Sequence, residues 1–194
     1  MERQRNMQSL SGGFRDPPAQ SARAFRAALE AMARPGTVQE VSGAAAPAPV
    51  SEAAATLLLT LCDPETPLCL AGAHDRREIR DWIAFHTGAP LVGAEEAVFA
   101  LGTWEALAPL GRFAIGTADY PDRSATLIVE CDAFGTEGAA RLTGPGIRDS
   151  AQFPLPDVAA VRENAALFPL GLDFYFTCGT RLAGLPRSTH VEAD

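Results

Sequence analysis

The sequence contains no lysine, and all sixteen of its basic residues are arginines. An enzyme that holds pyridoxal phosphate as a Schiff base needs a lysine, and a P-loop needs one to bind phosphate, so both classes are excluded. Acidic residues outnumber the basic ones: the chain has twenty-four of them, and its net charge is -8. Broad binding to nucleic acid or to an anionic membrane requires a basic surface, and we therefore expect neither.

Long apolar runs and metal-binding motifs are absent too. No apolar run is long enough to span a membrane, and the polar beginning of the chain lacks the apolar region of a secretory signal. The four cysteines form no C-x-x-C pair and lie beside apolar residues, which is typical of buried thiols in a reducing cytoplasm. Cys62, Cys69, His74 and His86 match no standard zinc spacing. We therefore expect a cytoplasmic protein without metal or other cofactor.

Helical and strand patterns alternate along the 194 residues, a length that points to one domain. The pattern predicts helices at 16–36, 51–62, 75–88 and 157–168. It predicts strands at 37–41, 67–72, 97–101, 125–131, 139–143 and 172–178, and a short edge strand at 182–186. Several strands are apolar at nearly every position, which is typical of a sheet covered on both faces. We predict a flexible segment over 1–13 and one three-layer α/β domain over 14–194, a mixed β-sheet flanked by helices.

Three details of this prediction concern packing. Phe25, Leu29 and Met32 fall on one side of the first helix and are expected to face the core. Ser51 and Asp157 are expected to cap their helices, and Asp75 with Glu78 matches a capping box for a third helix. The segment LDFYF at 172–176 is strongly hydrophobic and is a candidate sheet edge for contact with a second copy of the chain.

A glycine-rich loop, Gly144-Pro145-Gly146, follows a predicted strand and precedes the basic residue Arg148. A phosphate cradle directs several backbone N–H groups at one anion, but Pro145 has no N–H. Asp149 stands where a third glycine would complete the dinucleotide-binding motif, and its carboxylate would repel phosphate. A structural turn, in which the glycines provide positive φ or close packing, is the better interpretation.

Polar residues are densest between 116 and 127, just before the most apolar strand. Loops at this position of α/β folds often bind ligands. This loop contains Asp119, Tyr120, Asp122, Arg123 and Ser124. Ser124 has no nucleophile motif around it, so a turn built on Pro121 is favoured over catalysis. Candidate anion contacts are the arginines that lie beside proline or glycine: Arg15, Arg34, Arg148 and Arg187. His86 is interpreted as a helix-end residue, and His190 as a tail residue or a partner contact.

Eight stretches of the chain occur in an order that resembles the PhnH family, the H subunits of the carbon–phosphorus lyase core complex. They are GGFRDP, AFRAALEAMARPGTV, LLLTLCDPETPLCL, FHTGAP, IGTADYPDRSATLIVE, LTGPGI, FPLGLDFYFTCG and LPRSTHVE. The resemblance covers residues 12 to 192. It implies a fold reminiscent of the pyridoxal-phosphate-dependent transferases without that cofactor, which agrees with the missing lysine.

The resemblance also implies a function. PhnH-like proteins form homodimers and act in a complex with the G, I and J subunits. That complex transfers a phosphonate to the ribose C1 of ATP with loss of adenine, as an α-D-ribose 1-methylphosphonate 5-triphosphate synthase. A later radical step on an iron–sulfur cluster in another subunit cleaves the carbon–phosphorus bond. No catalytic residue is carried over. The candidate ligand or partner contacts are Asp119, Tyr120, Arg123, Ser124, Arg148, Arg187 and His190.

Two other classes of function are open at this stage. One is a stand-alone enzyme that uses Asp119 and Arg123, and the other is a module that binds phosphate, phosphonate or a nucleotide. The first requires an activity that alanine at Asp119 and Arg123 abolishes. The second requires binding by the isolated chain.

Overall fold

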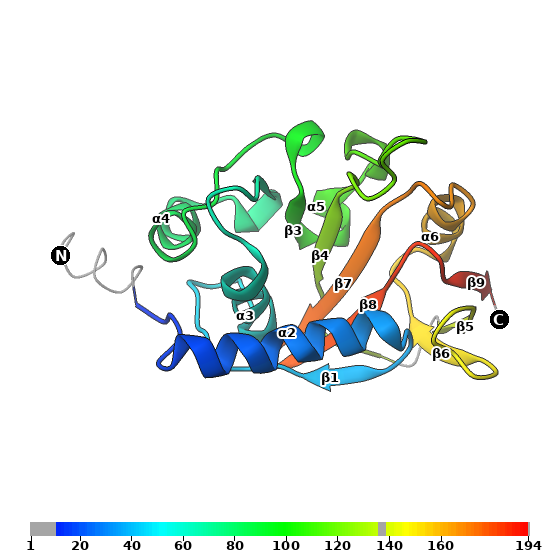
Figure 1. Ribbon diagram of the computed structural model, residues 1–194, viewed down its shortest axis with the longest axis horizontal. Helices are drawn as coiled ribbons and strands as arrows, with labels where there is room; N and C mark the ends of the chain where they lie inside the picture. The colour runs from blue at the N-terminus through cyan, green and yellow to red at the C-terminus, as the bar shows by residue number, and fades with distance from the viewer. Residues whose placement is uncertain (1–10, 136–138, 194) are drawn as a thin grey trace.

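The computed structural model describes residues 11–135 and 139–193 (Figure 1). Its α-helices are α2 (Pro17–Ala33), α3 (Glu52–Leu61), α4 (Arg77–His86), α5 (Trp104–Leu107) and α6 (Val158–Ala165). Its strands are β1 (Val38–Glu40), β2 (Leu68–Leu70), β3 (Phe99–Thr103), β4 (Thr126–Glu130), β5 (Ala139–Thr143), β6 (Ala151–Pro154), β7 (Asp173–Cys178), β8 (Arg181–Leu185) and β9 (His190–Ala193). Most of the predicted segments are therefore present, with shifted ends.

A six-stranded mixed sheet forms the centre of the molecule, in the order β1-β8-β7-β4-β3-β2. The strands β2, β3, β4 and β7 are parallel, whereas β8 and β1 run antiparallel to their neighbours. A second, antiparallel sheet has the order β6-β5-β9. The mixed α/β architecture is confirmed, but the segment 139–143 belongs to this second sheet rather than to the central one.

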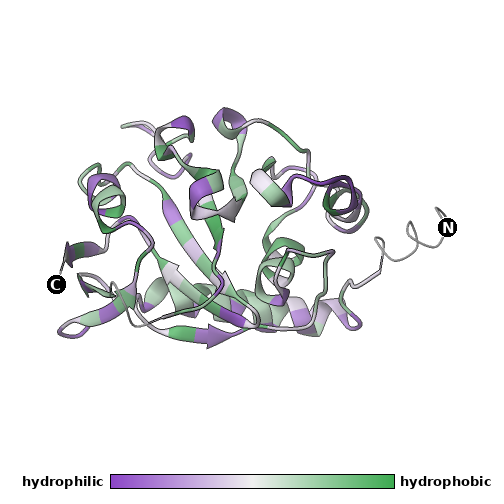
Figure 2. Ribbon diagram, turned by 180° about the vertical axis from the view of Figure 1, so that it is seen from behind, coloured by the Kyte–Doolittle hydropathy of each residue, from purple (hydrophilic) through white to green (hydrophobic). Residues whose placement is uncertain are grey.

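Two hydrophobic cores lie on opposite faces of the central sheet. The first is formed with α5, α6 and the second sheet, and it includes Trp104, Phe153, Phe174, Phe176 and Val191. The second is formed with α2, α3 and α4, and it includes Ala28, Leu57, Leu58, Trp82 and Tyr175. Figure 2 shows green and purple residues mixed along the covering helices, as expected of elements that have one apolar and one polar side.

The orientation of α2 differs from the prediction. Ala24, Ala28 and Ala31 are buried, whereas Phe25 is 48% exposed and Leu29 is 55% exposed. The cause lies beneath the helix, where a Cβ atom added to Gly184 of β8 would lie 2.6 Å from the backbone carbon of Ala31. Because the helix and the strand approach so closely, only small residues fit between them, and the larger apolar side chains face outward.

The helix caps follow the prediction in two cases out of three. The side chain of Ser51 accepts a hydrogen bond from the N–H of Ala54 at 3.1 Å. The side chain of Asp157 likewise accepts from Ala160 at 3.0 Å. The capping role predicted for Asp75 is wrong, because α4 begins after Arg76 without a side-chain cap. The Asp75 carboxylate instead pairs with the guanidinium of Arg80, which satisfies its charge.

Other predictions about packing can be compared with the structure. The strand β7 lies between β4 and β8, so the proposal that it forms a sheet edge is wrong. The segment 182–186 was expected at an edge too, but β8 lies between β7 and β1. Residues 1–10 of the predicted flexible segment lie outside the described residues. The carbonyl oxygen of Ser11 accepts a hydrogen bond from Trp82 Nε1 at 3.0 Å, and that of Gly12 accepts one from Ala45 N at 2.7 Å. In the part of the chain that the structure describes, no helix is long and apolar enough to cross a membrane.

Candidate functional site

The polar loop that begins at residue 116 and the segment that carries Arg187 meet at one edge of the central sheet. The parallel strands β4 and β7 begin there side by side, with Thr126 opposite Asp173. The antiparallel strand β8 ends at the same edge, since Leu185 lies opposite Phe174. The chain therefore leaves β8 next to the start of β7, and this topology places Arg187 beside Asp173.

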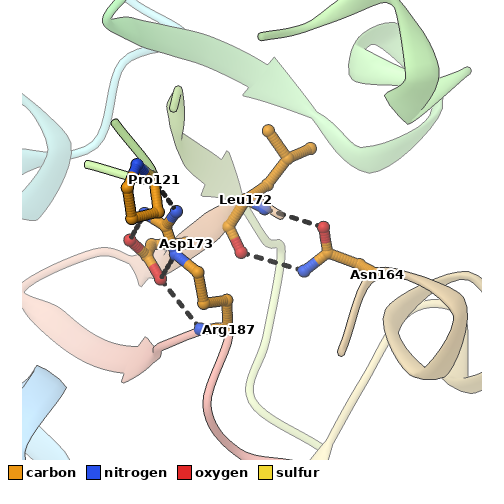
Figure 3. A network of polar contacts seen from close by, with 5 residues as sticks. All are labelled: Pro121, Asn164, Leu172, Asp173 and Arg187. Carbon is orange, nitrogen blue, oxygen red and sulfur yellow. Dashed lines mark hydrogen bonds and ion pairs between the residues drawn. The ribbon is translucent and has the colours of Figure 1, made fainter. Parts of the chain in front are cut away.

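Arg187 is the centre of a clamp at this edge, which we call the Arg187 clamp (Arg187, Asp173 and Pro121; Figure 3). Its Nη2 donates to Asp173 Oδ2 at 2.5 Å, and its Nε donates to Oδ1 at 3.1 Å. The Arg187 backbone N–H adds a bond to Oδ1 at 2.8 Å. Its Nη1 donates to the carbonyl oxygen of Pro121 at 2.6 Å. The two charged side chains are only 14% and 22% exposed.

A neighbouring contact fixes the start of β7 from the other side (Figure 3). The amide of Asn164, on α6, donates to the Leu172 carbonyl oxygen at 2.9 Å and accepts from the Leu172 N–H at 2.8 Å. Both hydrogen-bonding groups of that peptide residue are thereby satisfied in a buried position. Asn164 and Asp173 are the residues that the sequence analysis missed. Asp173 has one sequence signal, a carboxylate at the beginning of an otherwise apolar strand.

The polar loop itself is a compact turn. Gly116 has a φ of +84°, and a Cβ atom there would lie 2.6 Å from the Pro121 carbonyl oxygen, so the position requires glycine. The guanidinium of Arg123 lies 4.1 Å from the centre of the Tyr120 ring, in cation–π geometry. Ser124 is buried, and its hydroxyl has no hydrogen-bond partner in the described part of the chain. Asp119 and Tyr120 are exposed at the tip.

The Gly144-Pro145-Gly146 loop is a turn between β5 and β6. Gly144 and Gly146 have φ values of +122° and +83°. A Cβ atom on Gly146 would lie 1.9 Å from the Ala33 carbonyl oxygen at the end of α2. The glycines thus serve the backbone path and close packing. Arg148 is exposed beyond the turn, and His190 pairs with Thr143 in the strand register of the second sheet.

The structure separates the candidate contacts into two groups. The Pro121 carbonyl links the loop that carries Asp119, Tyr120, Arg123 and Ser124 to Arg187, so these residues share the Arg187 clamp region. Arg148 and His190 belong to the second sheet and its turn. Of the other arginines considered, Arg34 pairs with Glu30 at 2.9 Å. Because the Arg187 guanidinium is already bonded to a carboxylate and a carbonyl, it acts as a structural clamp in this conformation.

The opposite edge, where parallel strands end, is the usual ligand position in α/β sheets. A cleft of about 310 Å³ lies there, lined by Thr103, Trp104, Glu105, Val129, Glu130, Cys131, Asp132, Ala133, Phe134, Gly135, Pro154, Leu155 and Pro156. Its three carboxylates oppose the binding of phosphate or phosphonate. Among residues 11–135 and 139–193, no group of three or more histidine, cysteine or acidic side chains is arranged to hold a metal ion.

Glu130 is the buried carboxylate of this cleft. One of its oxygens accepts from the Ser51 N–H at 2.6 Å, and the other accepts from the Thr177 hydroxyl at 3.0 Å. Burial raises the pKa of Glu130 above its ordinary value of 4.5, and these hydrogen bonds offset only part of the effect. Burial also raises the pKa of the adjacent Cys131 thiol to about 12, which makes this thiol a weak nucleophile.

The raised pKa of Glu130 predicts a pH dependence of stability. A carboxyl group whose pKa is raised by folding stabilises the fold when protonated, and this contribution is lost as the pH rises through the folded pKa. We expect the unfolding free energy of the wild type to fall relative to that of Glu130→Gln as the pH rises from 4.5 toward neutrality. The slope cannot exceed about 1.4 kcal/mol per pH unit. Urea denaturation across this range measures it, and parallel curves for the two proteins contradict it.

Comparisons with known proteins give a consistent result. A family described as "Bacterial phosphonate metabolism protein (PhnH)" matches residues 12–192. A Rhizobium meliloti protein, named as the PhnH subunit of alpha-D-ribose 1-methylphosphonate 5-triphosphate synthase, is 41% identical over 197 residues, covering 96% of this chain and 98% of its own. A Stutzerimonas stutzeri protein, named "Putative C-P lyase subunit protein HtxG", is 29% identical over 178 residues, covering 87% of this chain and 84% of its own.

Proposed function

This chain belongs to the PhnH family of bacterial phosphonate metabolism proteins, and from that premise we propose that it is a subunit of the carbon–phosphorus lyase core complex. In that role it supports the transfer of methylphosphonate to the ribose C1 of ATP, with release of adenine. The observation that carries the proposal is the 41% identity to a synthase subunit over nearly the whole of both chains.

The chemistry of the described residues supports an assembly role rather than a catalytic one. The largely buried ion pair of the Arg187 clamp holds strand ends and a loop in place. The cleft at the opposite edge is acidic, which disfavours phosphonate and ATP as its ligands. Ser124, which has no hydrogen-bond partner in the described ranges, lacks a base to activate it. The proposal therefore assigns the chemistry to the complex and not to this chain alone.

The proposed partners are the G, I and J subunits, together with a second copy of this chain in the isolated protein. The loop 116–124, which Arg187 holds through the Pro121 carbonyl, exposes Asp119, Tyr120 and Arg123, and we propose that they contact a neighbouring subunit. Tyr120 is 51% exposed, and Arg123 stacks on its ring. A stacked guanidinium and phenol present a rigid surface, which lowers the entropy lost on docking. The proposal also includes one domain over 14–194 and a fold related to the pyridoxal-phosphate-dependent transferases. It places the protein in the cytoplasm.

Co-expression with the G, I and J subunits tests this function. We expect the chain to co-purify with a tagged partner subunit, and we expect the purified assembly to release adenine from ATP when methylphosphonate is present. The chain alone should release none, since the proposal assigns the catalytic groups to the assembled complex. Adenine release by the isolated chain, or no co-purification, contradicts the proposal. Calorimetric titration of the isolated chain with ATP, phosphate and methylphosphonate tests the alternative of a stand-alone binding protein.

A further inference from the structure

Two of the four cysteines follow each other's strands at the point where the parallel strands β4 and β7 end. Glu130 pairs with Thr177 in the strand register, so the next residues along the two strands are Cys131 and Cys178. The Cys131 N–H donates to the Thr177 carbonyl oxygen at 2.8 Å, which keeps the two strands together at this position. The Thr177 hydroxyl also donates to a Glu130 carboxylate oxygen across the strands at 3.0 Å. The same register therefore makes the two cysteines neighbours.

Both thiols lie on the same face of the sheet. Val129 and Phe176 belong to the first hydrophobic core, and residues two positions further along a strand point the same way. Cys131 packs against that core, and the Cys178 thiol donates to the Asp132 carbonyl oxygen at 3.3 Å. Neighbouring strands lie about 4.8 Å apart, within the Cα separation of about 4.4–6.8 Å that a disulfide spans. A disulfide can therefore form here without separating the strands.

This pair is also the more accessible one. Cys131 and Cys178 are partly exposed, whereas Cys62 and Cys69 are buried, so the expectation of buried thiols is wrong for two of the four cysteines. Cys131 lines the acidic cleft of about 310 Å³. Carboxylates repel an anionic oxidant, but they do not repel a small neutral one. The surroundings therefore favour hydrogen peroxide as the oxidant that reaches these sulfurs.

The two sulfurs have different surroundings and therefore different roles. The Arg181 guanidinium donates from Nη2 to Cys178 Sγ at 3.4 Å. A cation in this position stabilises the negative charge that a sulfur carries when it attacks. At the other sulfur, burial, followed by the neighbouring Cys178 and three carboxylates, raises the pKa of the Cys131 thiol to about 12. Cys178 is thus the thiol that reacts first with an oxidant.

We propose that Cys131 and Cys178 are an oxidative modification site and form a reversible disulfide with hydrogen peroxide. The Cys178 thiolate attacks one peroxide oxygen: an S–O bond forms, the O–O bond breaks, and the leaving oxygen takes up the thiol proton as water. The Cys131 thiol then attacks the Cys178 sulfur. The S–S bond forms, the S–O bond breaks, and a second water carries away the Cys131 proton. Together the two thiols give two electrons to the peroxide.

The second step takes place between neighbouring groups of one chain. An intramolecular reaction of this kind has a high effective concentration, which compensates for the weak nucleophilicity of Cys131. The disulfide ties β4 to β7 on the cleft side, and so fixes the part of the cleft wall that Cys131 forms. Disulfides of cytoplasmic proteins are usually transient, and thiol reductants reverse them. The site lies at the opposite edge of the sheet from the Arg187 clamp and does not depend on the proposed function.

Peroxide treatment of the isolated chain, followed by alkylation in denaturant and peptide mapping, tests the inference. We expect the mass of the chain to fall by two hydrogen atoms and the number of free thiols to fall from four to two. Mapping should find one peptide that links Cys131 to Cys178, and dithiothreitol should restore all four thiols. Cys131→Ser should stop at a Cys178 sulfenic acid, which dimedone traps. Cys178→Ser should lose thiols to peroxide about tenfold more slowly than the wild type.

Cys69→Ser is the matched control, because it changes a buried thiol and should leave the linkage and its rate as in the wild type. The linkage is mapped in the wild type, so the result does not depend on how well the variants fold. Four free thiols after treatment, a sulfenic acid that persists in the wild type without linkage, or a disulfide between two chains overturns the inference. None of these results bears on co-purification with the other subunits.

Discussion

Replacing Arg187 by alanine is expected to lower the free energy of unfolding by about 3 kcal/mol, because it leaves the Asp173 carboxylate without its guanidinium partner. Removing one member of a buried ion pair costs roughly 3–5 kcal/mol, and the 14% and 22% exposure of this pair places it at the lower end. The change also removes the bond to the Pro121 carbonyl, which frees the loop 116–124. Urea denaturation monitored by circular dichroism measures the loss.

Two comparisons give this experiment its control. Arg187→Lys keeps the positive charge but cannot form the two parallel bonds to Asp173, so we expect a smaller loss of about 1–2 kcal/mol. Arg123→Ala removes an arginine of the same region that stacks on an exposed ring, and it should change stability by no more than about 1 kcal/mol. Equal stability of Arg187→Ala and Arg123→Ala means that the Arg187 clamp does not hold this edge together.

Replacing Gly184 by alanine is expected to destabilise the protein by about 2–3 kcal/mol. The added methyl group would lie 2.6 to 2.8 Å from the backbone atoms of Ala31 and Met32. Backbone atoms cannot move aside as a flexible side chain can, so α2 must shift away from β8.

Gly111→Ala is the matched control for this change. Gly111 has nothing within 4 Å of the position that a Cβ atom would take, and its φ lies outside the left-handed region. The substitution should be neutral, or stabilising by about 0.4–1 kcal/mol through a less flexible unfolded chain. If Gly184→Ala is equally harmless, the close packing of α2 on β8 is not a source of stability.

The sequence patterns were informative where local chemistry decides the structure. The caps at Ser51 and Asp157 depend on neighbouring residues, and the apolar run of β4 requires cover on both faces whatever its neighbours are. The turn at Gly144-Pro145-Gly146 was likewise predictable, because proline removes a donor and glycine accepts positive φ. Each of these features is set by residues within a few positions of one another.

Features that depend on distant residues were not predictable in the same way. The helical period of α2 shows two apolar sides, one of alanines and one with Phe25 and Leu29, and only the glycine of β8 decides which is buried. The Arg187 clamp joins residues 14 and 66 positions apart in the chain. The strands β6 and β9 are short and partly polar, and they acquire their pairing only from β5 between them.

The two tryptophans occupy opposite faces of the central sheet. Trp82, on α4, is fully buried in the second core, and Trp104 lies against Phe174 in the first core with their ring centres 5.9 Å apart. The protein therefore carries one tryptophan in each of its hydrophobic cores. Versions that keep a single indole can report on each face by itself during unfolding, without any added dye.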